Sequence, residues 1–383
     1  MSEPTTARDD RQVLVVGEGL VGLTVAAFLR ERGFDPTVVA GSPERSSGVE
    51  TLGECAVLWH TSVALLAEIG VLEALSPSAT AVETWLLSTV DGTVLDCLET
   101  AHHDAYPFLA VDRRRLRRAL RDRLPQHSVR VTKTPRTLRT DDGPPTVEFE
   151  DGVRERFDLV VGADGIDSWV RTAGFDAPEP TPWGTTSWAF RAEGEGTPGT
   201  VGEVWGSDAM AAVVPGASGV HGRLVTRTDD AGAAASALES AFARSDHPVV
   251  GRLDCPVPDT LVGIRDRVSR PDCRATDRLA LVGDAARSLP PCSVGPNPAL
   301  EDAYVLAEEL AGRGGSAAAL GRYAARRRDR LRRLDDRIRA DGTCRYPLSV
   351  AGLPDLLELR RSLLRSSFAS RAVEPGGSPS RWL

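Results

Sequence analysis

Residues 13–22 read Val-Leu-Val-Val-Gly-Glu-Gly-Leu-Val-Gly, and this stretch decides the fold. Four apolar residues predict a buried strand, and the glycines that follow, Gly17, Gly19 and Gly22, have the G-x-G-x-x-G spacing. A helical pattern comes next, and then a second β-branched run at residues 37–39. A strand, a glycine turn, a helix and a strand within roughly 30 residues predict a βαβ unit, the first module of a doubly wound parallel sheet.

Each glycine of the turn has a physical reason to be there. Gly17 permits a tight turn, Gly19 lets the backbone approach a pyrophosphate, and Gly22 lets the helix pack closely on the strand. The helix begins with Leu20 and Val21, and its N-terminus attracts phosphate charge. We therefore expect all five residues to contact a dinucleotide. A purely structural glycine turn is the alternative, because this motif alone is a weak signal.

Residues 157–171 form a second motif, Phe-Asp-Leu-Val-Val-Gly-Ala-Asp-Gly-Ile-Asp-Ser-Trp-Val-Arg. It predicts a buried strand that ends in a turn, with Asp164 and Gly165 at the carboxyl end of the strand, where ligands bind in open sheets. The alternative is again a structural turn. The stretch closely resembles the DG fingerprint of the para-hydroxybenzoate hydroxylase-like flavoprotein monooxygenases. In that family the fingerprint is associated with the use of both FAD and NAD(P)H.

Residues 278–286, Arg-Leu-Ala-Leu-Val-Gly-Asp-Ala-Ala, form a third motif. They resemble the GD motif of the same family, in which the aspartate contacts the FAD ribose. The resemblance therefore implies cofactor contacts at Gly283 and Asp284. A buried strand that ends in a Gly-Asp turn is the physical basis for this assignment.

The segment after the GD motif, residues 289–303, resembles the loop and helix that lie against the isoalloxazine ring. The resemblance implies cofactor contacts at Pro291, Gly295 and Asn297. Asn297 suits an N-cap and Pro298 suits the first helical position, so we expect a helix to begin here with its positive end exposed. A capped helix that points at water is the alternative.

Two arginines complete the expected cofactor site. Arg113, with Leu116, fits the Arg-x-x-Leu that the family places at the head of a helix near the flavin. Arg45 lies in the loop where family members often have an arginine for the FAD phosphates. Because Arg113 belongs to an arginine-rich run, a solvated helix face is the alternative for it.

Composition limits the other classes of function. The chain has 383 residues and a formal net charge of −8, which argues against a nucleic-acid partner. Its polar start and the absence of a long apolar run predict a soluble, cytoplasmic protein without an integral membrane segment. The six cysteines show no metal-ligand spacing, so we expect neither a metal site nor a disulfide framework. Arginines of the run 326–339 alternate with Leu331, Leu334 and Ile338 and predict the solvated face of an amphipathic helix.

Two kinds of segment alternate along the chain. Helical patterns at residues 61–75 and 112–124 and buried-strand runs at 157–161 and 279–282 belong to the nucleotide-binding type. Residues 82–98 and 185–258 alternate apolar and polar side chains and predict antiparallel strands. The predicted class is α/β, a Rossmann-like FAD-binding domain with an inserted antiparallel β-sheet substrate domain and C-terminal helices. The predicted bounds are 11–80, 107–175 and 271–315 for the discontinuous FAD-binding domain, 81–106 and 176–270 for the inserted domain, and 316–383 for the C-terminal helical segment.

The resemblance implies an FAD-dependent monooxygenase that consumes NADH or NADPH and O2 and hydroxylates a small aromatic or conjugated substrate. We name no catalytic side chain, because the cofactor carries the difficult chemistry and the protein supplies binding, orientation and water exclusion. The substrate is expected between the inserted sheet and the flavin. The oligomeric state is left open. The candidate substrate contacts are Trp188, Phe190, Arg191, Trp205 and Met210.

Three departures from the family pattern bear on activity. Ala40 stands where such folds usually have an acid for the ribose, and Arg287 stands where the family usually has histidine. The flavin loop is one residue shorter than usual and carries Pro296. Two alternatives therefore stay open: another flavin oxidoreductase on the same scaffold, a reductase or a halogenase, and a catalytically weak FAD-binding accessory protein.

Overall fold

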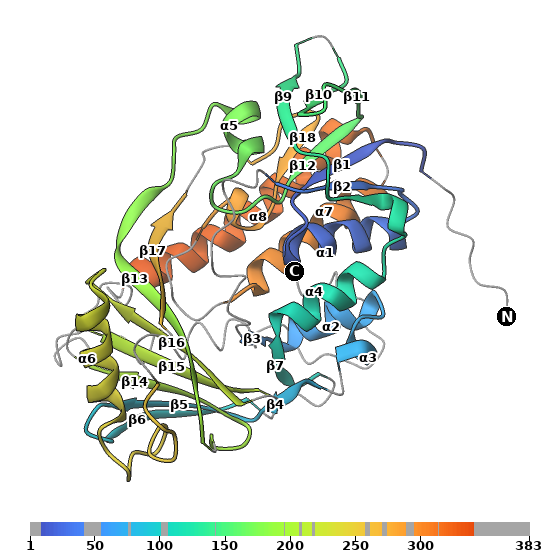
Figure 1. Cartoon of the computed structure of the whole chain (residues 1–383). Coiled ribbons are helices and arrows are strands. Elements are labelled where there is room, and N and C mark those ends of the chain that lie inside the picture. The colour runs from blue at the N-terminus through green and yellow to red at the C-terminus, as the bar shows by residue number, and fades with distance from the viewer. Residues whose placement is uncertain are drawn as a thin grey trace, which may run out of the picture.

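A computed structural model provides the structure of the protein. It describes residues 9–41, 55–75, 78–100, 106–141, 143–194, 196–206, 209–216, 219–256, 261–269, 274–288, 295–312 and 314–340. Two lobes are visible, one built on a parallel sheet and one on a larger, mostly antiparallel sheet (Figure 1). Within the described ranges, none of the helices combines the length and the apolar character that a bilayer-spanning helix needs.

The first lobe contains a five-stranded sheet in the order β18-β12-β1-β2-β8, in which all neighbours are parallel. The predicted βαβ unit is confirmed, and so are the two predicted buried strands, β12 and β18, which extend the sheet on the other side of β1. Strands that are far apart in the sequence therefore lie side by side. The strands are β1 (Val13–Val16), β2 (Thr37–Val39), β8 (Val129–Arg130), β12 (Leu159–Gly162) and β18 (Leu279–Leu281).

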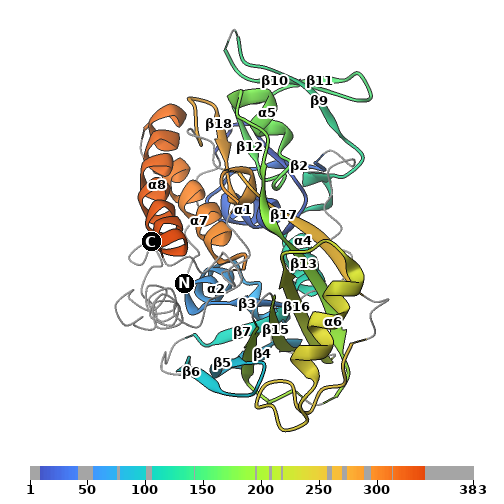
Figure 2. The same ribbon diagram turned by 90° about the vertical axis from the view of Figure 1, so that its left-hand side faces the viewer.

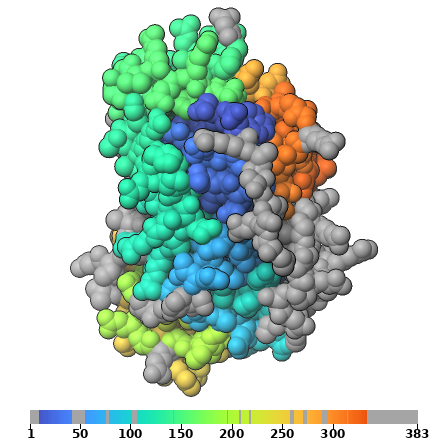
Figure 3. All heavy atoms as spheres, turned by 90° about the vertical axis from the view of Figure 1, so that its right-hand side faces the viewer, coloured from blue at the N-terminus to red at the C-terminus, as the bar shows by residue number. Residues whose placement is uncertain are grey.

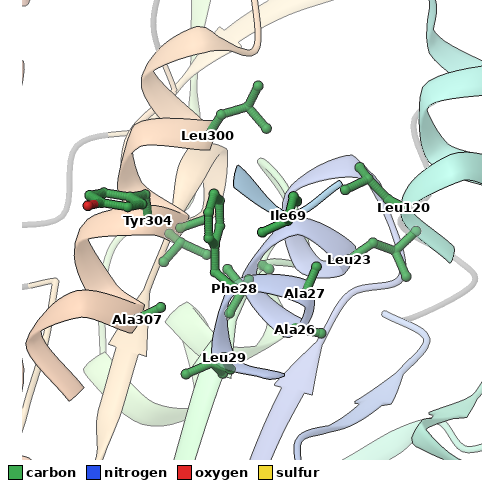
Figure 4. Packing of buried hydrophobic residues seen from close by; sticks show 14 of the residues in the cluster. Leu23, Ala26, Ala27, Phe28, Leu29, Ile69, Leu120, Leu300, Tyr304 and Ala307 are labelled. Carbon is green, nitrogen blue, oxygen red and sulfur yellow. The ribbon is translucent and has the colours of Figure 1, made fainter. Parts of the chain in front are cut away.

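Helices α1 (Leu20–Glu31) and α7 (Asn297–Ala311) pack against each other beside this sheet. The rings of Phe28 and Tyr304 meet edge to face, with centroids 5.4 Å apart, in the centre of the contact (Figure 4). Helix α8 (Ser316–Ala340) packs on α7, and α4 (Arg113–Asp122) packs on α1. In the space-filling view, the N-terminal part of the chain (blue) lies between the region of α4 and the C-terminal helices (Figure 3).

The helix predicted over residues 61–75 is interrupted. It forms α2 (His60–Glu68) and α3 (Leu72–Leu75), because Gly70 adopts a left-handed conformation (φ 66°) that ends the first helix. These helices lie beside a three-stranded sheet in the order β3-β7-β4. Its strands are β3 (Cys55–Leu58), β4 (Thr80–Val82) and β7 (Phe108–Asp112).

A second three-stranded sheet, in the order β11-β10-β9, was not expected from the sequence. Its strands are too short to show a clear alternating pattern of apolar and polar residues. The strands are β9 (Pro135–Arg139), β10 (Thr146–Phe149) and β11 (Arg154–Arg156); the remaining small elements of this lobe are α5 (Trp169–Phe175), η4 (Gln126–Ser128) and η6 (Gly283–Ala285).

The second lobe is a seven-stranded sheet in the order β17-β13-β16-β15-β14-β5-β6, antiparallel except for the pair β14 and β5. The predicted class, an α/β fold with an inserted antiparallel sheet, is confirmed. Helix α6 (Ala231–Phe242) covers the outer face (Figure 2), so the prediction of strands throughout residues 185–258 is wrong there. The strands are β5 (Thr84–Thr89), β6 (Val94–Glu99), β13 (Thr181–Ala192), β14 (Thr200–Trp205), β15 (Ala209–Gly216), β16 (Gly219–Thr226) and β17 (Val262–Val268).

Candidate functional site

The three glycine-containing motifs follow three adjacent parallel strands. The G-x-G-x-x-G turn follows β1, the DG motif follows β12, and the GD motif follows β18. Because the strands are parallel and adjacent, their carboxyl ends lie at one edge of the sheet, where doubly wound sheets bind ligands. Strand β1 has β2 as its neighbour on one side and β12 on the other. The strand order therefore reverses at β1, which makes this edge a topological switch point. We call it the nucleotide edge.

Backbone contacts hold the first two motifs together. Gly17 has φ 117°, and a Cβ atom there would lie 2.3 Å from the carbonyl oxygen of Ala163 in the DG motif. A Cβ on Gly22 would lie 1.8 Å from the carbonyl oxygen of Gly17. Backbone atoms cannot move aside as the end of a side chain can. Both positions therefore require glycine. The close packing at Gly22 agrees with the prediction from the sequence, whereas the contact of Gly17 with the DG motif was not expected.

The GD motif packs against the same glycine turn and helix. Gly283 has φ 58°, and a Cβ there would lie 3.2 Å from both Val21 in α1 and Ala299 in α7. The backbone N–H of Gly283 donates to Asp302 over 2.9 Å. The third motif thus lies against the first turn of α1 and the first turn of α7.

Asp164 of the DG motif serves the backbone of its own loop. Its carboxylate accepts hydrogen bonds from the Ser168 hydroxyl (2.5 Å) and from the N–H groups of Trp169 (2.6 Å) and Val170 (3.1 Å). It therefore helps to cap α5. Burial raises the pKa of this carboxyl above its ordinary value, and the hydrogen bonds oppose that shift.

Asp284 of the GD motif has a side chain that is open to solvent. Protein nevertheless surrounds it closely enough that burial raises its pKa, while the nearby Arg113 opposes the shift and Asp302 adds to it. The exposed area decides what can reach the group, so we take Asp284 to be accessible to a ligand.

The arginine-rich helix α4 is tied to the nucleotide edge. Arg113, at its first position, lies close enough to Asp284 to influence its titration. Arg117 donates to the Glu18 carbonyl (3.1 Å) and pairs with the Glu18 carboxylate (2.9 Å), which Arg121 also approaches (3.5 Å). The two ion pairs with Glu18 were not predicted from the sequence. The spacing of four residues between Arg117 and Arg121 does indicate that both side chains lie on one face of the helix. The helix is therefore more than a solvated face.

Arg171, the last residue of the DG fingerprint, was also missed. It is only 1% exposed, and its guanidinium donates to the carbonyls of Ile166 (2.6 Å) and Ala285 (3.3 Å). Arg171 therefore bridges the DG and GD motifs by way of their backbones.

Asn297 does not have the predicted role of N-cap. Pro296 occupies that position, and the Asn297 side chain accepts from the Trp59 N–H (2.8 Å) and donates to the Val57 carbonyl (2.9 Å). An N-cap assignment from sequence considers only local partners, whereas these partners lie 238 and 240 positions upstream. The side chain thus fastens the start of α7 to the junction of β3 and α2.

Two predicted cofactor contacts, Arg45 and Pro291, lie outside the described residues. Gly295 is described and has φ 55°, so the chain enters α7 through a conformation that suits glycine. Gly165 also has a positive φ (78°), and among the described residues no atom lies within 4 Å of the place that a Cβ would occupy there. The positions of Gly19 and Leu20 agree with the predicted turn and helix start, since α1 begins at Leu20 with Gly19 before it.

The inner face of the seven-stranded sheet turns towards the first lobe. Val214 on β15 packs in one cluster with Trp59 and Phe108 of the first lobe. Separately, Arg267 near the end of β17 joins the sheet to the DG loop through a two-pronged ion pair with Asp167 (2.6 Å for both bonds). Side chains alternate along strands, so Met210 shares this face with Val214. The inner face therefore lies towards the start of α2 and strand β7 of the first lobe.

Two of the candidate substrate contacts are wrong. Trp188 and Phe190 point to the outer face and pack against α6. Their rings fill the space beside glycines of the neighbouring strands, because a Cβ on Gly222 would lie 2.0 Å from Phe190 and one on Gly263 would lie 2.6 Å from Trp188. Trp205 and Met210 cluster on the opposite, inner face.

Polar groups accompany the apolar ones on the inner face. Asp266 on β17 accepts hydrogen bonds from the hydroxyls of Thr185 (2.6 Å) and Ser187 (2.8 Å) on β13. Burial raises the pKa of Asp266, and the two hydroxyls and Arg223 oppose the shift. None of these residues was singled out from the sequence, because serine, threonine and aspartate on a strand give no local functional signal.

Comparison with known proteins agrees with this geometry. Residues 10–337 match the model of a family described as FAD binding domain. The chain is 31% identical over 333 residues to 3-amino-4-hydroxybenzoate 2-monooxygenase of Streptomyces cremeus, and the match covers 80% of each protein.

Solved structures share the fold. HpxO of Klebsiella pneumoniae, complexed with FAD and uric acid, is similar with a TM-score of 0.74 and 23% identity, over 95% of this chain and 94% of that one. PqsL of P. aeruginosa, in complex with 2-aminobenzoylacetate, is similar with a TM-score of 0.76 and 20% identity, over 92% of this chain and 99% of that one. The chain therefore belongs to the FAD-binding family of flavin-dependent monooxygenases of the para-hydroxybenzoate hydroxylase type, which confirms the family and the cofactor that its motifs predict.

Proposed function

We propose that the protein uses NADH or NADPH and O2 to hydroxylate a small aromatic or conjugated ring, held between the nucleotide edge and the inner face of the large sheet. The observation that carries this proposal is the placement of three motifs on adjacent parallel strands, together with a sheet face that mixes apolar and polar side chains. When bound, FAD supplies the electron transfer from NAD(P)H and the activation of O2.

The residues of the nucleotide edge fit a dinucleotide. Gly19 lies directly before the N-terminus of α1, whose dipole favours the charge of a pyrophosphate. Asp284 is accessible and can accept a hydrogen bond from a ribose hydroxyl. Asn297 fixes the start of α7 next to Gly295, where the ring system is proposed to lie. The remaining proposed contacts are Leu20, Val21, Gly22, Arg45, Arg113, Asp164, Gly165, Gly283 and Pro291.

We propose that the substrate binds against the inner face of the large sheet. Trp205, Met210 and Val225 form an apolar cluster there, and Asp266 with its two hydroxyl donors supplies a polar anchor. The relative in Streptomyces cremeus is named for a substrate with amino, hydroxyl and carboxylate groups on one benzene ring. An aminohydroxybenzoate is therefore the first compound to test. A hydroxyl or amino group that donates to Asp266 would orient such a ring.

The predicted domain bounds and location belong to the same proposal. Residues 11–80, 107–175 and 271–315 would bind FAD, residues 81–106 and 176–270 would supply the sheet, and 316–383 would complete the C-terminal segment. The ion pair of Arg267 with Asp167 supports a fixed relation between sheet and DG loop. A cytoplasmic location, where NAD(P)H is available, is part of the proposal.

The test begins with the purified protein. Its bound cofactor is identified by chromatography and mass spectrometry, and oxidation of NADH and of NADPH is then recorded with 3-amino-4-hydroxybenzoate, related phenols and larger conjugated acids. Incorporation of one oxygen atom from labelled O2 into a product is the expected result. Turnover without O2 would instead indicate a reductase. Tight FAD binding without turnover of any compound would favour the accessory role that Ala40 and Pro296 suggest.

A further inference from the structure

A group of buried charges lies between α7 and α8, where the sequence predicts a solvated helix face. Arg327 is 1% exposed. Its Nε donates to Asp302 over 2.6 Å, and its Nη2 lies 2.9 Å from Glu301 and 3.0 Å from the Pro298 carbonyl. One guanidinium on α8 therefore holds two carboxylates and a backbone carbonyl of the first turns of α7.

The same group reaches the GD motif. Asp302 accepts the backbone N–H of Gly283 (2.9 Å), and the hydroxyl of Tyr323 donates to the Leu281 carbonyl (2.7 Å). Arg274 lies 3.5 Å from both Asp302 and the Tyr323 hydroxyl. The strand end before the GD turn and the first residue of that turn are thus hydrogen-bonded to the buried charges.

The Glu301 carboxylate is held in its ionised form. Burial alone would raise the pKa of Glu301, but Arg330 and Arg327 bring it below its ordinary value. Arg330 contributes through bonds of 3.1 and 3.3 Å. Glu301 therefore carries a negative charge at neutral pH.

Stability alone is a poor explanation for such a group. Replacing a buried ion pair by apolar residues is often neutral or stabilising, because desolvating the charges offsets most of their attraction. The same two helices also show a simpler arrangement near the C-terminal end of α7, where Glu309 pairs with Arg322 (2.6 Å) and Arg326 (2.8 Å), and Arg322 is 42% exposed. The buried group differs in one respect that matters for function: it is fastened to the GD turn.

We propose that Arg327 is a positioning residue for the flavin. Through Asp302 and the Pro298 carbonyl it fixes the GD turn relative to the N-terminus of α7, and so it sets both the affinity for FAD and the flavin reduction potential. The proposal rests on the proposed function, in which FAD occupies the nucleotide edge. The influence of α8 passes through α7 and the GD turn.

The test compares variants of the full-length protein. Arg327→Lys keeps the charge but cannot bond to both carboxylates in the same geometry, Arg327→Met removes the charge, and Arg322→Met is the matched control on the same helices. Dissociation of FAD is measured by quenching of flavin fluorescence, the potential by spectroelectrochemical titration, and folding by urea denaturation. We expect Arg327→Lys to weaken FAD binding at least about tenfold and to shift the potential, and Arg322→Met to change neither.

Asp302→Asn provides a second route if Arg327→Met does not fold. Asparagine keeps an acceptor for the Gly283 N–H but removes the charge that Arg327 holds. We expect the same direction of change in potential as in Arg327→Lys. Wild-type FAD affinity and potential in both Arg327→Lys and Asp302→Asn would overturn the inference. Absence of FAD binding by the wild-type protein would instead overturn the proposed function.

Discussion

The nucleotide edge and the large sheet are built on different kinds of contact. Where the first two motifs of the nucleotide edge meet, backbone lies against backbone: a Cβ on Gly17 would collide with the Ala163 carbonyl. In the large sheet, backbone meets side chain: a Cβ on Gly222 would meet the ring of Phe190. A backbone contact permits one residue type, whereas a side-chain contact permits several combinations of size.

We propose separate tasks for the two regions. Fixed backbone geometry suits a cofactor that the whole family shares, and replaceable side chains suit a substrate that differs between family members. Damage at the nucleotide edge should then abolish cofactor binding, and damage on the inner face should change substrate affinity while the cofactor stays bound. The predictions below test this separation.

Gly17→Ala should have the largest effect. The unfavourable backbone conformation costs about 1–3 kcal/mol, and overpacking against a carbonyl adds about 1–3 kcal/mol. We expect loss of bound FAD and a clearly lower midpoint of urea denaturation. Gly152→Ala is the control, because Gly152 also has a positive φ (81°) but nothing lies within 4 Å of its Cβ position. A Gly17→Ala protein that retains FAD would show that this backbone contact is not needed.

The same difference explains what sequence can reveal. The elements β1, α1, β2, β12 and β18 are predictable because glycine spacing and continuous apolar runs are local signs of backbone constraints. Helix α6 is not predictable in this way, since its alanine-rich segment lacks a strong periodic pattern and its cap, Asp230, is a common turn residue as well.

Side-chain partners distant in sequence are the part that could not be predicted. Asn297 looks like a helix cap until Trp59 and Val57 are brought to it. Arg327 looks like one of many solvated arginines until Glu301 and Asp302 neutralise it. In each case the local pattern is ambiguous, and only the tertiary contact decides the role.

Glu301→Gln should make the stability of the folded protein less dependent on pH in the acidic range. The folded-state pKa of Glu301 lies below the ordinary carboxyl value of 4.5, so its stabilising contribution is present above that pH and is lost as the pH falls through the folded-state pKa. Breaking a buried pair costs about 3–5 kcal/mol, and the amide, which still accepts hydrogen bonds, should place this variant at the lower end.

The measurement is the thermal midpoint of both proteins between about pH 7 and pH 3, which spans the ordinary carboxyl range. Asp164 and Asp284 have raised pKa values and act in the opposite direction, but they are present in both proteins and cancel in the difference. We expect a stability difference at neutral pH that shrinks on acidification. A constant difference across this range would contradict the titration of Glu301.

Asp284→Ala should weaken FAD binding without unfolding the protein. A hydrogen bond to a charged group contributes about 1.5–3 kcal/mol, which corresponds to roughly a ten- to hundredfold change in the dissociation constant. Ala40→Glu should act in the reverse direction, since Ala40 follows the last paired residue of β2 at the position of the usual ribose acid. Fluorescence titration of both variants checks this. Looser binding by Ala40→Glu would show that the end of β2 does not face the ribose.

The smallest effect is expected on the inner face. Asp266→Asn should raise the KM for the substrate identified by the oxidation assays by roughly three- to tenfold, equivalent to about 0.6–1.4 kcal/mol, with FAD affinity unchanged. Because burial raises the pKa of Asp266, the wild-type KM should also rise as the pH is lowered towards that pKa, and the variant should lose this dependence. The control is Trp188→Phe on the outer face, which loses the indole bond to Thr226 (2.9 Å) and about 1 kcal/mol of stability but should keep the wild-type KM. The reverse pattern, with KM altered only by Trp188→Phe, would place the substrate on the outer face and remove the basis for the separation of tasks.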